Sequence, residues 1–167
     1  MLDILQRLEA TGVGTLVRES LYGFQILVAV HVMALVLSVG MILWFDLRLL
    51  GFALGSAPVS RVYRRLIPWA TSGFVVMFTS GALLFTGFAT AAYQSPFFRI
   101  KVSALLLAAA NAAFYHLVTE RRGRSWDDDA TPPAAARLAG LVSMALWTTV
   151  ILCGRLMAYT MYSQGPG

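Results

Sequence analysis

The sequence predicts an all-α integral membrane protein, a four-helix bundle whose successive helices run antiparallel. Of the 167 residues, 58% are hydrophobic and only 13% are charged, and the apolar residues fall into four long runs. A soluble domain of this length would expose more apolar surface than water tolerates. A segment that crosses lipid must satisfy its own backbone hydrogen bonds, so each run is expected to be a helix.

The N-terminal residues 1–20 are predicted to form an amphipathic segment on the membrane surface. Leu2, Leu5 and Leu8 recur on one side of a helix until Gly12–Gly14 interrupt the pattern. Charged residues are scattered between them, so no apolar stretch suited to a cleaved signal peptide is present. The first spanning helix is predicted over about residues 21–46, long enough for a bilayer core.

Three more spanning helices are predicted over about residues 67–92, 97–119 and 132–162, with a short tail at 163–167. Together with the first they form one transmembrane domain, 21–162. Pro68 suits the first turn of the second helix, and Pro132 suits the first turn of the fourth. The polar stretch before Pro132 contains Asp127–Asp129 and is expected to be a solvated loop, balanced by the arginines before it.

Basic residues distinguish the two ends of the predicted bundle. Eight arginines flank the first and third loops, whereas the opposite end has Arg7, Arg18, Arg99 and Lys101. The eight are Arg48, Arg61, Arg64, Arg65, Arg121, Arg122, Arg124 and Arg137. The positive-inside rule therefore predicts both termini outside, in a bacterial inner membrane. The net charge of +5 is explained by this orientation, and no nucleic-acid partner is expected.

The candidate cofactor ligands are the only two histidines, His31 near the middle of the first run and His116 near the end of the third. Ionisable residues at membrane depth mark functional sites by default, and imidazole is the usual axial ligand of haem b. A neutral His31 bonded to a neighbouring helix and a His116 reaching the interface are the alternatives. A shared iron is strained, because their levels differ by about 12 Å along the membrane normal.

Two cations, Lys101 and Arg155, are predicted in the same half of the bundle as His31. Either could pair with haem propionates, or simply extend to the outer interface. Copper is the alternative cofactor, with His31 and the single cysteine, Cys153, as ligands beside methionines. One cysteine excludes an intramolecular disulfide and any CxxC motif.

The segments His31–Gly40, Asp46–Gly51 and Lys101–Asn111, with His116, resemble a family of uncharacterised four-helix bacterial inner-membrane proteins over nearly the whole chain. More distantly, the early histidine and the lysine that opens the third helix are similar to copper-resistance D proteins and to HemJ-type protoporphyrinogen oxidases. This second resemblance implies that His31 and Lys101 form a functional pair, with His31 on haem or a metal.

Three functions fit these observations. The first is a small redox subunit that holds one haem b and passes electrons between quinone and a membrane or periplasmic partner, as an accessory subunit rather than a stand-alone enzyme. The second is a copper or small-solute permease. The third is a non-catalytic structural subunit of a larger membrane complex or a homo-oligomer. No nucleophile–base set, phosphate loop or zinc motif supports a hydrolase or kinase.

Overall fold

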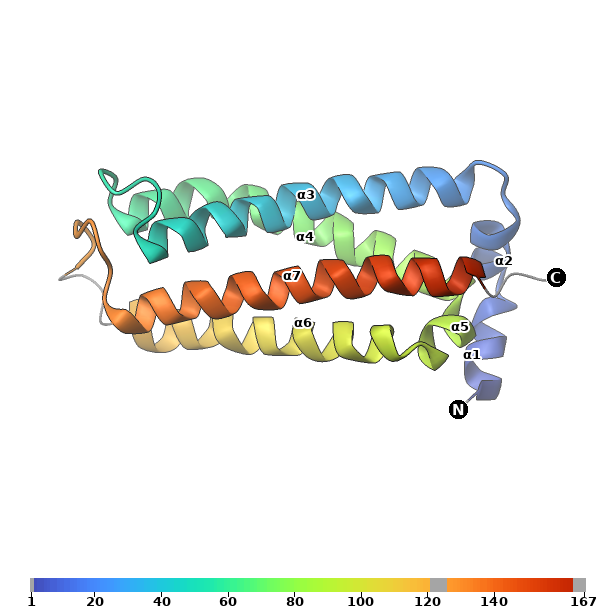
Figure 1. Ribbon diagram of the computed structural model, residues 1–167. Coiled ribbons are helices and arrows are strands. Elements are labelled where there is room, and N and C mark those ends of the chain that lie inside the picture. Colours follow the sequence, from blue (N-terminus) through green and yellow to red (C-terminus); the bar gives the residue numbers. More distant parts are fainter. Residues whose placement is uncertain (1, 121–125, 164–167) are drawn as a thin grey trace.

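Four long helices form a bundle, and two short helices lie across one of its ends (Figure 1). The computed structural model describes residues 2–120 and 126–163. These residues contain no strand, which confirms the all-α prediction. The elements are α1 (Leu2–Glu9), α2 (Gly12–Glu19), α3 (Gly23–Leu50), α4 (Val59–Gly87), α5 (Ala89–Gln94), α6 (Pro96–Phe114), the π-helix η1 (Tyr115–Glu120) and α7 (Ala134–Ser163).

Four helices are long and apolar enough to cross a membrane: Gly23–Leu50, Val59–Gly87, Pro96–Leu117 and Ala134–Thr160. In their most apolar windows only 17%, 22%, 11% and 17% of the residues, respectively, are buried inside the chain. Most of this apolar surface therefore faces outward, where lipid can cover it and water cannot. The helices indicate a multi-pass membrane protein.

The second long helix, α4, starts well before the predicted residue 67. Pro68 consequently lies inside the helix and not in its first turn. The apolar run begins only after Arg65, but the arginines before it continue the same helix as a charged extension. Proline is tolerated within spanning helices because neighbouring groups can satisfy the freed backbone carbonyl.

The predicted end of the second helix at 92 is also wrong, because α4 stops at Gly87 and α5 follows as a separate short helix. The reason is the close crossing of α2. A Cβ on Gly14 would lie 2.8 Å from the Thr86 carbonyl oxygen, and one on Gly87 would lie 2.9 Å from Val17. Two glycines thus let α2 pack against the last turn of α4.

The remaining helix ends differ less from their predicted positions. α3 continues past 46 to Leu50, and the third helix finishes as the π-helix η1. α7 starts two residues later than predicted, at Ala134, because the Pro133 carbonyl accepts the first backbone bonds, from Ala136 and Arg137. Arg121, Arg122 and Arg124 of the predicted loop and residues 164–167 of the predicted tail lie outside the described residues.

The N-terminal segment contains a break at Thr11 and not at Gly12–Gly14, which instead form the first turn of α2. The Thr11 hydroxyl accepts a hydrogen bond from the Gly14 amide at 3.2 Å and so caps α2. The preceding helix is fixed by Glu9, whose carboxylate accepts the Thr90 amide at 2.7 Å, at the start of α5. Both short helices are therefore tied to the end of the bundle.

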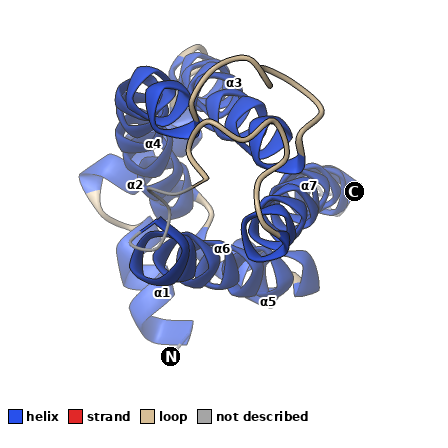
Figure 2. Ribbon diagram, turned by 90° about the vertical axis from the view of Figure 1, so that its left-hand side faces the viewer, coloured by secondary structure: helices blue, strands red, loops and turns tan. Residues whose placement is uncertain are grey.

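The long helices associate as two pairs, α3 with α4 and α6 with α7, and α3 also packs against α7 (Figure 2). No close backbone approach joins α4 to α6 in the described ranges. The first pair is the tightest, since a Cβ on Gly73 would lie 2.8 Å from the Ser38 amide nitrogen. Small residues at a crossing allow such an approach between membrane helices.

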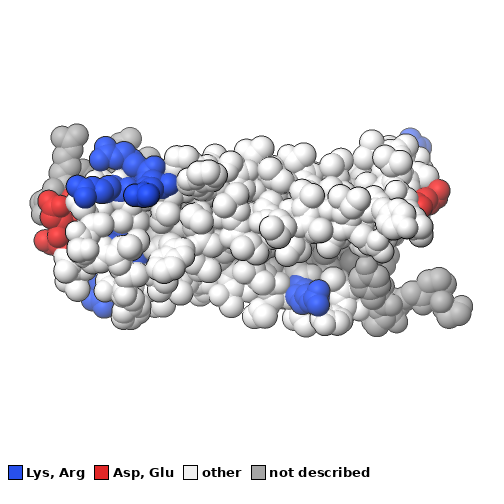
Figure 3. Space-filling view, turned by 90° about the horizontal axis from the view of Figure 1, so that it is seen from above, with Lys and Arg blue, Asp and Glu red and all other residues white. Residues whose placement is uncertain are grey.

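Loops close the end of the bundle that lies opposite α1 and α2. Figure 3 shows Lys and Arg side chains gathered at this end, followed by a broad uncharged band. Arg48 is fully buried there, and its guanidinium donates to the Ala57 carbonyl at 3.0 Å and the Asp129 carbonyl at 2.8 Å. A buried arginine thus joins the α3–α4 connection to the segment before α7.

Asp127 caps α4 from a distant part of the sequence, so this part of the predicted solvated loop is structural. Its carboxylate accepts the Ser60 amide at 2.7 Å and the Ser60 hydroxyl at 2.6 Å. Burial opposes ionisation, but the Ser60 hydrogen bonds and the charges of Arg64 and Arg48 outweigh it and lower the pKa of Asp127.

Candidate functional site

The imidazole of His31, on α3, is oriented by α4. Its Nδ1 lies 3.0 Å from the Ser80 hydroxyl oxygen, which itself donates to the Val76 carbonyl at 2.7 Å. Because the bond to Val76 uses the hydrogen of the Ser80 hydroxyl, we assign the hydrogen between Ser80 and His31 to Nδ1 of the imidazole. The Met77 carbonyl is a further acceptor for this N–H group. The neutral ring then keeps its lone pair on Nε2.

A glycine forms the surface beneath this ring. A Cβ on Gly81 would lie 3.0 Å from Cε1 of His31, so even alanine would press on the imidazole. The bond to α4 is the one expected of a purely structural histidine. It is also the arrangement of a ligating histidine, whose second nitrogen is usually fixed by a hydrogen bond of this kind.

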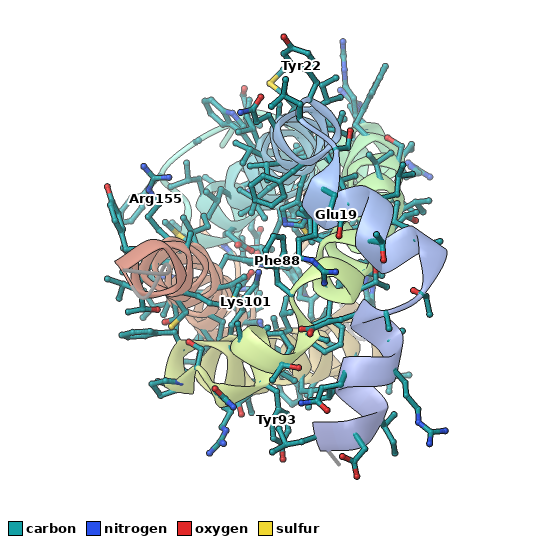
Figure 4. The ribbon with its side chains drawn as sticks, turned by 90° about the vertical axis from the view of Figure 1, so that its right-hand side faces the viewer. Glu19, Tyr22, Phe88, Tyr93, Lys101 and Arg155 are labelled. Carbon is teal, nitrogen blue, oxygen red and sulfur yellow. The ribbon has the colours of Figure 1, made fainter. Side chains whose placement is uncertain are left out.

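The structure brings Lys101 into the same half of the bundle as His31, as the sequence predicted. Lys101 is partly buried on α6 and points inward (Figure 4), close enough to His31 and Cys153 for electrostatic interaction. Its Nζ lies 3.6 Å from where a Cβ on Gly154 would stand. No carboxylate pairs with it in the part of the chain that the structure describes.

Arg155 does not join this group. Figure 4 shows its side chain at the outer edge of the bundle, directed away from Lys101. Its guanidinium carbon lies 5.0 Å from the centre of the Tyr159 ring, on the same helix. The exposed cation therefore stacks on an interfacial aromatic residue and does not face the interior.

His116 lies far from His31, although both contact α4. His116 Nε2 lies 3.4 Å from the Tyr63 hydroxyl, whereas His31 bonds to Ser80. Tyr63 and Ser80 are separated by about 17 residues of helix, or roughly 25 Å at about 1.5 Å per residue. The two histidines thus do not share one iron.

His116 instead lines a cavity of about 310 Å³ between the four long helices. Asp46, Tyr63, Asn111 and Ser143 supply further polar groups to its lining, and the other lining residues are largely aromatic or aliphatic. Neither His31 nor Lys101 lines this cavity. The bundle therefore contains two separate polar groups, one in each half.

Asp46 is a site residue that the sequence analysis did not single out, because it lies at the predicted end of the first helix. It lies inside α3, is only 3% exposed, and borders the cavity. A signal was present: Asp46 and Arg48 are enclosed by apolar residues on both sides, from Trp44 to Phe52, with no polar loop between. Charged residues enclosed in this way indicate that the first spanning helix continues past Asp46 and Arg48.

The fold does not bring together a set of side chains that could bind copper within the described residues. No group of three or more His, Cys, Asp or Glu side chains placed to hold a metal occurs among residues 2–120 and 126–163. Met33, a proposed soft ligand, is 71% exposed on the outer face of α3. The fold instead places one imidazole, that of His31, and one cation, Lys101, in the same half of the bundle.

Comparison with known proteins identifies a family to which the chain belongs. A family model described as a family of unknown function (DUF6644) matches residues 18–160, which cover all four long helices. No curated protein and no solved structure matches the chain. The match agrees with the resemblance to an uncharacterised family and does not extend to copper-resistance D or HemJ-type proteins. The chain belongs to this family of unknown function, DUF6644.

Proposed function

We propose that the protein is a small membrane redox subunit that holds one haem b through His31 and passes electrons between quinone and a partner protein. The observation that carries the proposal is the placement of His31 and Lys101 in one half of the bundle. His31 has its Nδ1 hydrogen engaged by α4, which leaves the Nε2 lone pair for iron. Lys101 supplies a cation without a described carboxylate partner.

The donor set fits this cofactor better than it fits copper. One neutral imidazole suits axial ligation of haem, and a partly buried ammonium suits a propionate, because charge-assisted bonds are the stronger ones. Haem would supply the one-electron chemistry. The chain's own residues would hold and orient it, Ser80 by fixing the His31 ring and Lys101 by neutralising a carboxylate. His116 would not contribute to holding this group, given its separation from His31 along α4.

We place the subunit in the bacterial inner membrane with both termini outside. Arginines collect at the end of the bundle formed by the α3–α4 and α6–α7 connections, which supports a cytoplasmic position for that end (Figure 3). His31 and Lys101 would then lie in the outer half, within reach of a periplasmic partner or a second copy of the chain.

A visible spectrum of the purified protein tests the cofactor. We expect detergent-solubilised protein to show Soret and α bands that sharpen on reduction, with about one haem per chain. His31→Ala should lose these bands while keeping its helical circular dichroism, because the iron loses its ligand. His116→Ala is the matched control, an equivalent truncation in the other half of the bundle, and should keep them.

Three results would contradict the proposal. Wild-type protein that remains colourless after expression with an ample haem supply would leave His31 as a structural histidine. Bands that survive in His31→Ala and vanish in His116→Ala would show that the haem is bound in the half of the bundle that contains His116. Co-purification with a large complex and no cofactor would favour the non-catalytic subunit.

A further inference from the structure

The carboxylate of Asp46 is enclosed within the membrane-spanning part of the chain. It is 3% exposed, and its Oδ2 has no hydrogen-bond partner within the described residues, although the Ser143 side chain from α7 interacts with the carboxyl group. The backbone of α7 comes very close here, since a Cβ on Gly140 would lie 3.2 Å from the Asp46 carbonyl oxygen. A buried polar atom without a partner costs stability, so it invites a functional explanation.

The nearest cation in sequence does not compensate Asp46. Arg48, two residues later, directs its guanidinium to the carbonyls of Ala57 and Asp129 in the loops. Among residues 2–120 and 126–163, no Lys or Arg lines the cavity that Asp46 borders. Within this described lining, Asp46 is the one carboxyl group, and neither a lysine nor an arginine lies against it as a counter-charge.

Aromatic side chains form much of the cavity wall around this carboxyl group. Six rings contribute: Phe45, Tyr63, Phe74, Phe78, Tyr115 and Trp147. Aromatic faces attract cations, most strongly where water is excluded. Calcium and magnesium are bound mainly through carboxylates and carbonyl oxygens, and Asp46 is the one carboxylate among the described lining residues.

The cavity can be reached from the lipid side between α4 and α6. These two helices make no close backbone contact in the described ranges. Phe78 on α4 lines the cavity yet is 55% exposed, and Ala109 and Ala112 on α6 likewise line it while remaining exposed. A solute dissolved in the bilayer could thus enter sideways without crossing the loops.

We propose that this cavity binds a small apolar organic cation, such as a quaternary or protonated amine, with Asp46 as its counter-charge. The aromatic rings surround the apolar part of the ligand and stabilise its charge, while Oδ2 of Asp46 gains a partner that it lacks among the described residues. The volume of about 310 Å³ admits a single-ring ligand. The site is separate from His31 and Lys101, and it does not depend on a haem.

The test compares two ligands that differ only in charge. Benzyltrimethylammonium carries the cation, and neopentylbenzene replaces its nitrogen with carbon at nearly the same shape. Each is titrated into purified protein in detergent, with tryptophan fluorescence, to which the cavity residue Trp147 contributes, and calorimetry as readouts and protein-free micelles as the blank. We expect the cation to bind at least about tenfold more tightly than its neutral analogue.

Two variants assign the charge selectivity to Asp46. Asp46→Asn keeps the shape and should remove the preference for the cation, while Asp128→Asn, an exposed control, should retain it. Equal binding of both ligands by the wild type would overturn the proposal and favour an uncharged ligand such as a quinone head group. An unchanged cation affinity in Asp46→Asn would also overturn it. If Asp46→Asn does not fold, the wild-type comparison alone decides.

Discussion

The carboxylate of Asp127 shows how one side chain outside the bilayer can fix the start of a helix from a distant part of the sequence. It satisfies the Ser60 amide and hydroxyl in the first turn of α4, while its own carbonyl accepts the Val59 amide at 3.0 Å. The free amides at the start of a helix are normally capped by the preceding residue. Here that residue is Pro58, whose side chain cannot accept a hydrogen bond, and the distant loop supplies the acceptor.

Replacing this cap should lower stability by an amount typical of capping residues. We expect Asp127→Ala to lose about 1 kcal/mol of unfolding free energy at neutral pH, because the Ser60 donors lose their acceptor. Thermal unfolding in detergent, followed by circular dichroism, measures the change. Asp128→Ala removes a neighbouring exposed carboxylate and is the matched control, with little expected effect.

The same contact predicts a pH dependence. The pKa of Asp127 is lowered in the folded protein, so its stabilisation is complete above the unfolded pKa and is lost as pH falls through the folded pKa. The difference in melting temperature between wild type and Asp127→Ala should therefore shrink between about pH 7 and about pH 3. A difference that stays constant over this range would show that the carboxylate's charge contributes nothing.

At the level of single residues, the sequence predicted the approximate position of the candidate residues better than their contacts. The imidazole of His31 and the ammonium of Lys101 could be placed in one half of the bundle by counting along the helices. Asp46 could not, because its burial depends on the approach of Gly140 from α7, a contact between residues far apart in the chain. Whether a charge ends a helix or continues inside it is decided by such partners.

The crossing of α3 and α4 depends on one glycine, and the chain provides its own control. A Cβ on Gly73 would meet the Ser38 amide at 2.8 Å, whereas one on Gly40 would meet nothing within 4 Å. Gly73→Ala should therefore cost about 1–3 kcal/mol through overpacking. Gly40→Ala should be neutral or stabilising by up to about 1 kcal/mol, since it only reduces backbone freedom.

Melting temperatures of the two variants in the same detergent provide the measurement. Gly73→Ala should unfold at a lower temperature than the wild type, and Gly40→Ala at the same or a higher one. Equal behaviour of the two would mean that α3 and α4 can move apart freely at this crossing. His31 would then not be held against α4 by the packing of the pair.

For the helices, hydropathy located the four spans well and their ends less well. The predicted start of α4 at 67 followed the apolar run, yet the helix begins at Val59 because arginines and a distant cap extend it outside the lipid. Its break at Gly87 was invisible in composition, since it arises where α2 crosses. Length and apolarity reveal a span, whereas packing partners decide where it stops.

In the whole molecule, two polar groups occupy opposite halves of one bundle. His31 and Lys101 lie toward the end covered by α1 and α2, and Asp46 and His116 lie toward the end rich in arginine. A site that exchanges electrons with a periplasmic partner and a site that draws a cation from lipid would thus face different sides of the membrane. Which side each faces depends on the orientation of the chain.

Labelling with a membrane-impermeant maleimide tests that orientation. The native thiol, Cys153, is buried and should stay unlabelled, so single cysteines can be added at the exposed positions Asp3 and Asp128. In intact cells, Asp3→Cys should react and Asp128→Cys should react only after permeabilisation, because the positive-inside rule predicts that the end rich in arginine is cytoplasmic. The reverse pattern would put the haem proposed at His31 in the inner half, where a periplasmic partner could not approach it. Labelling of both positions in intact cells would contradict their location at opposite ends of the spanning helices.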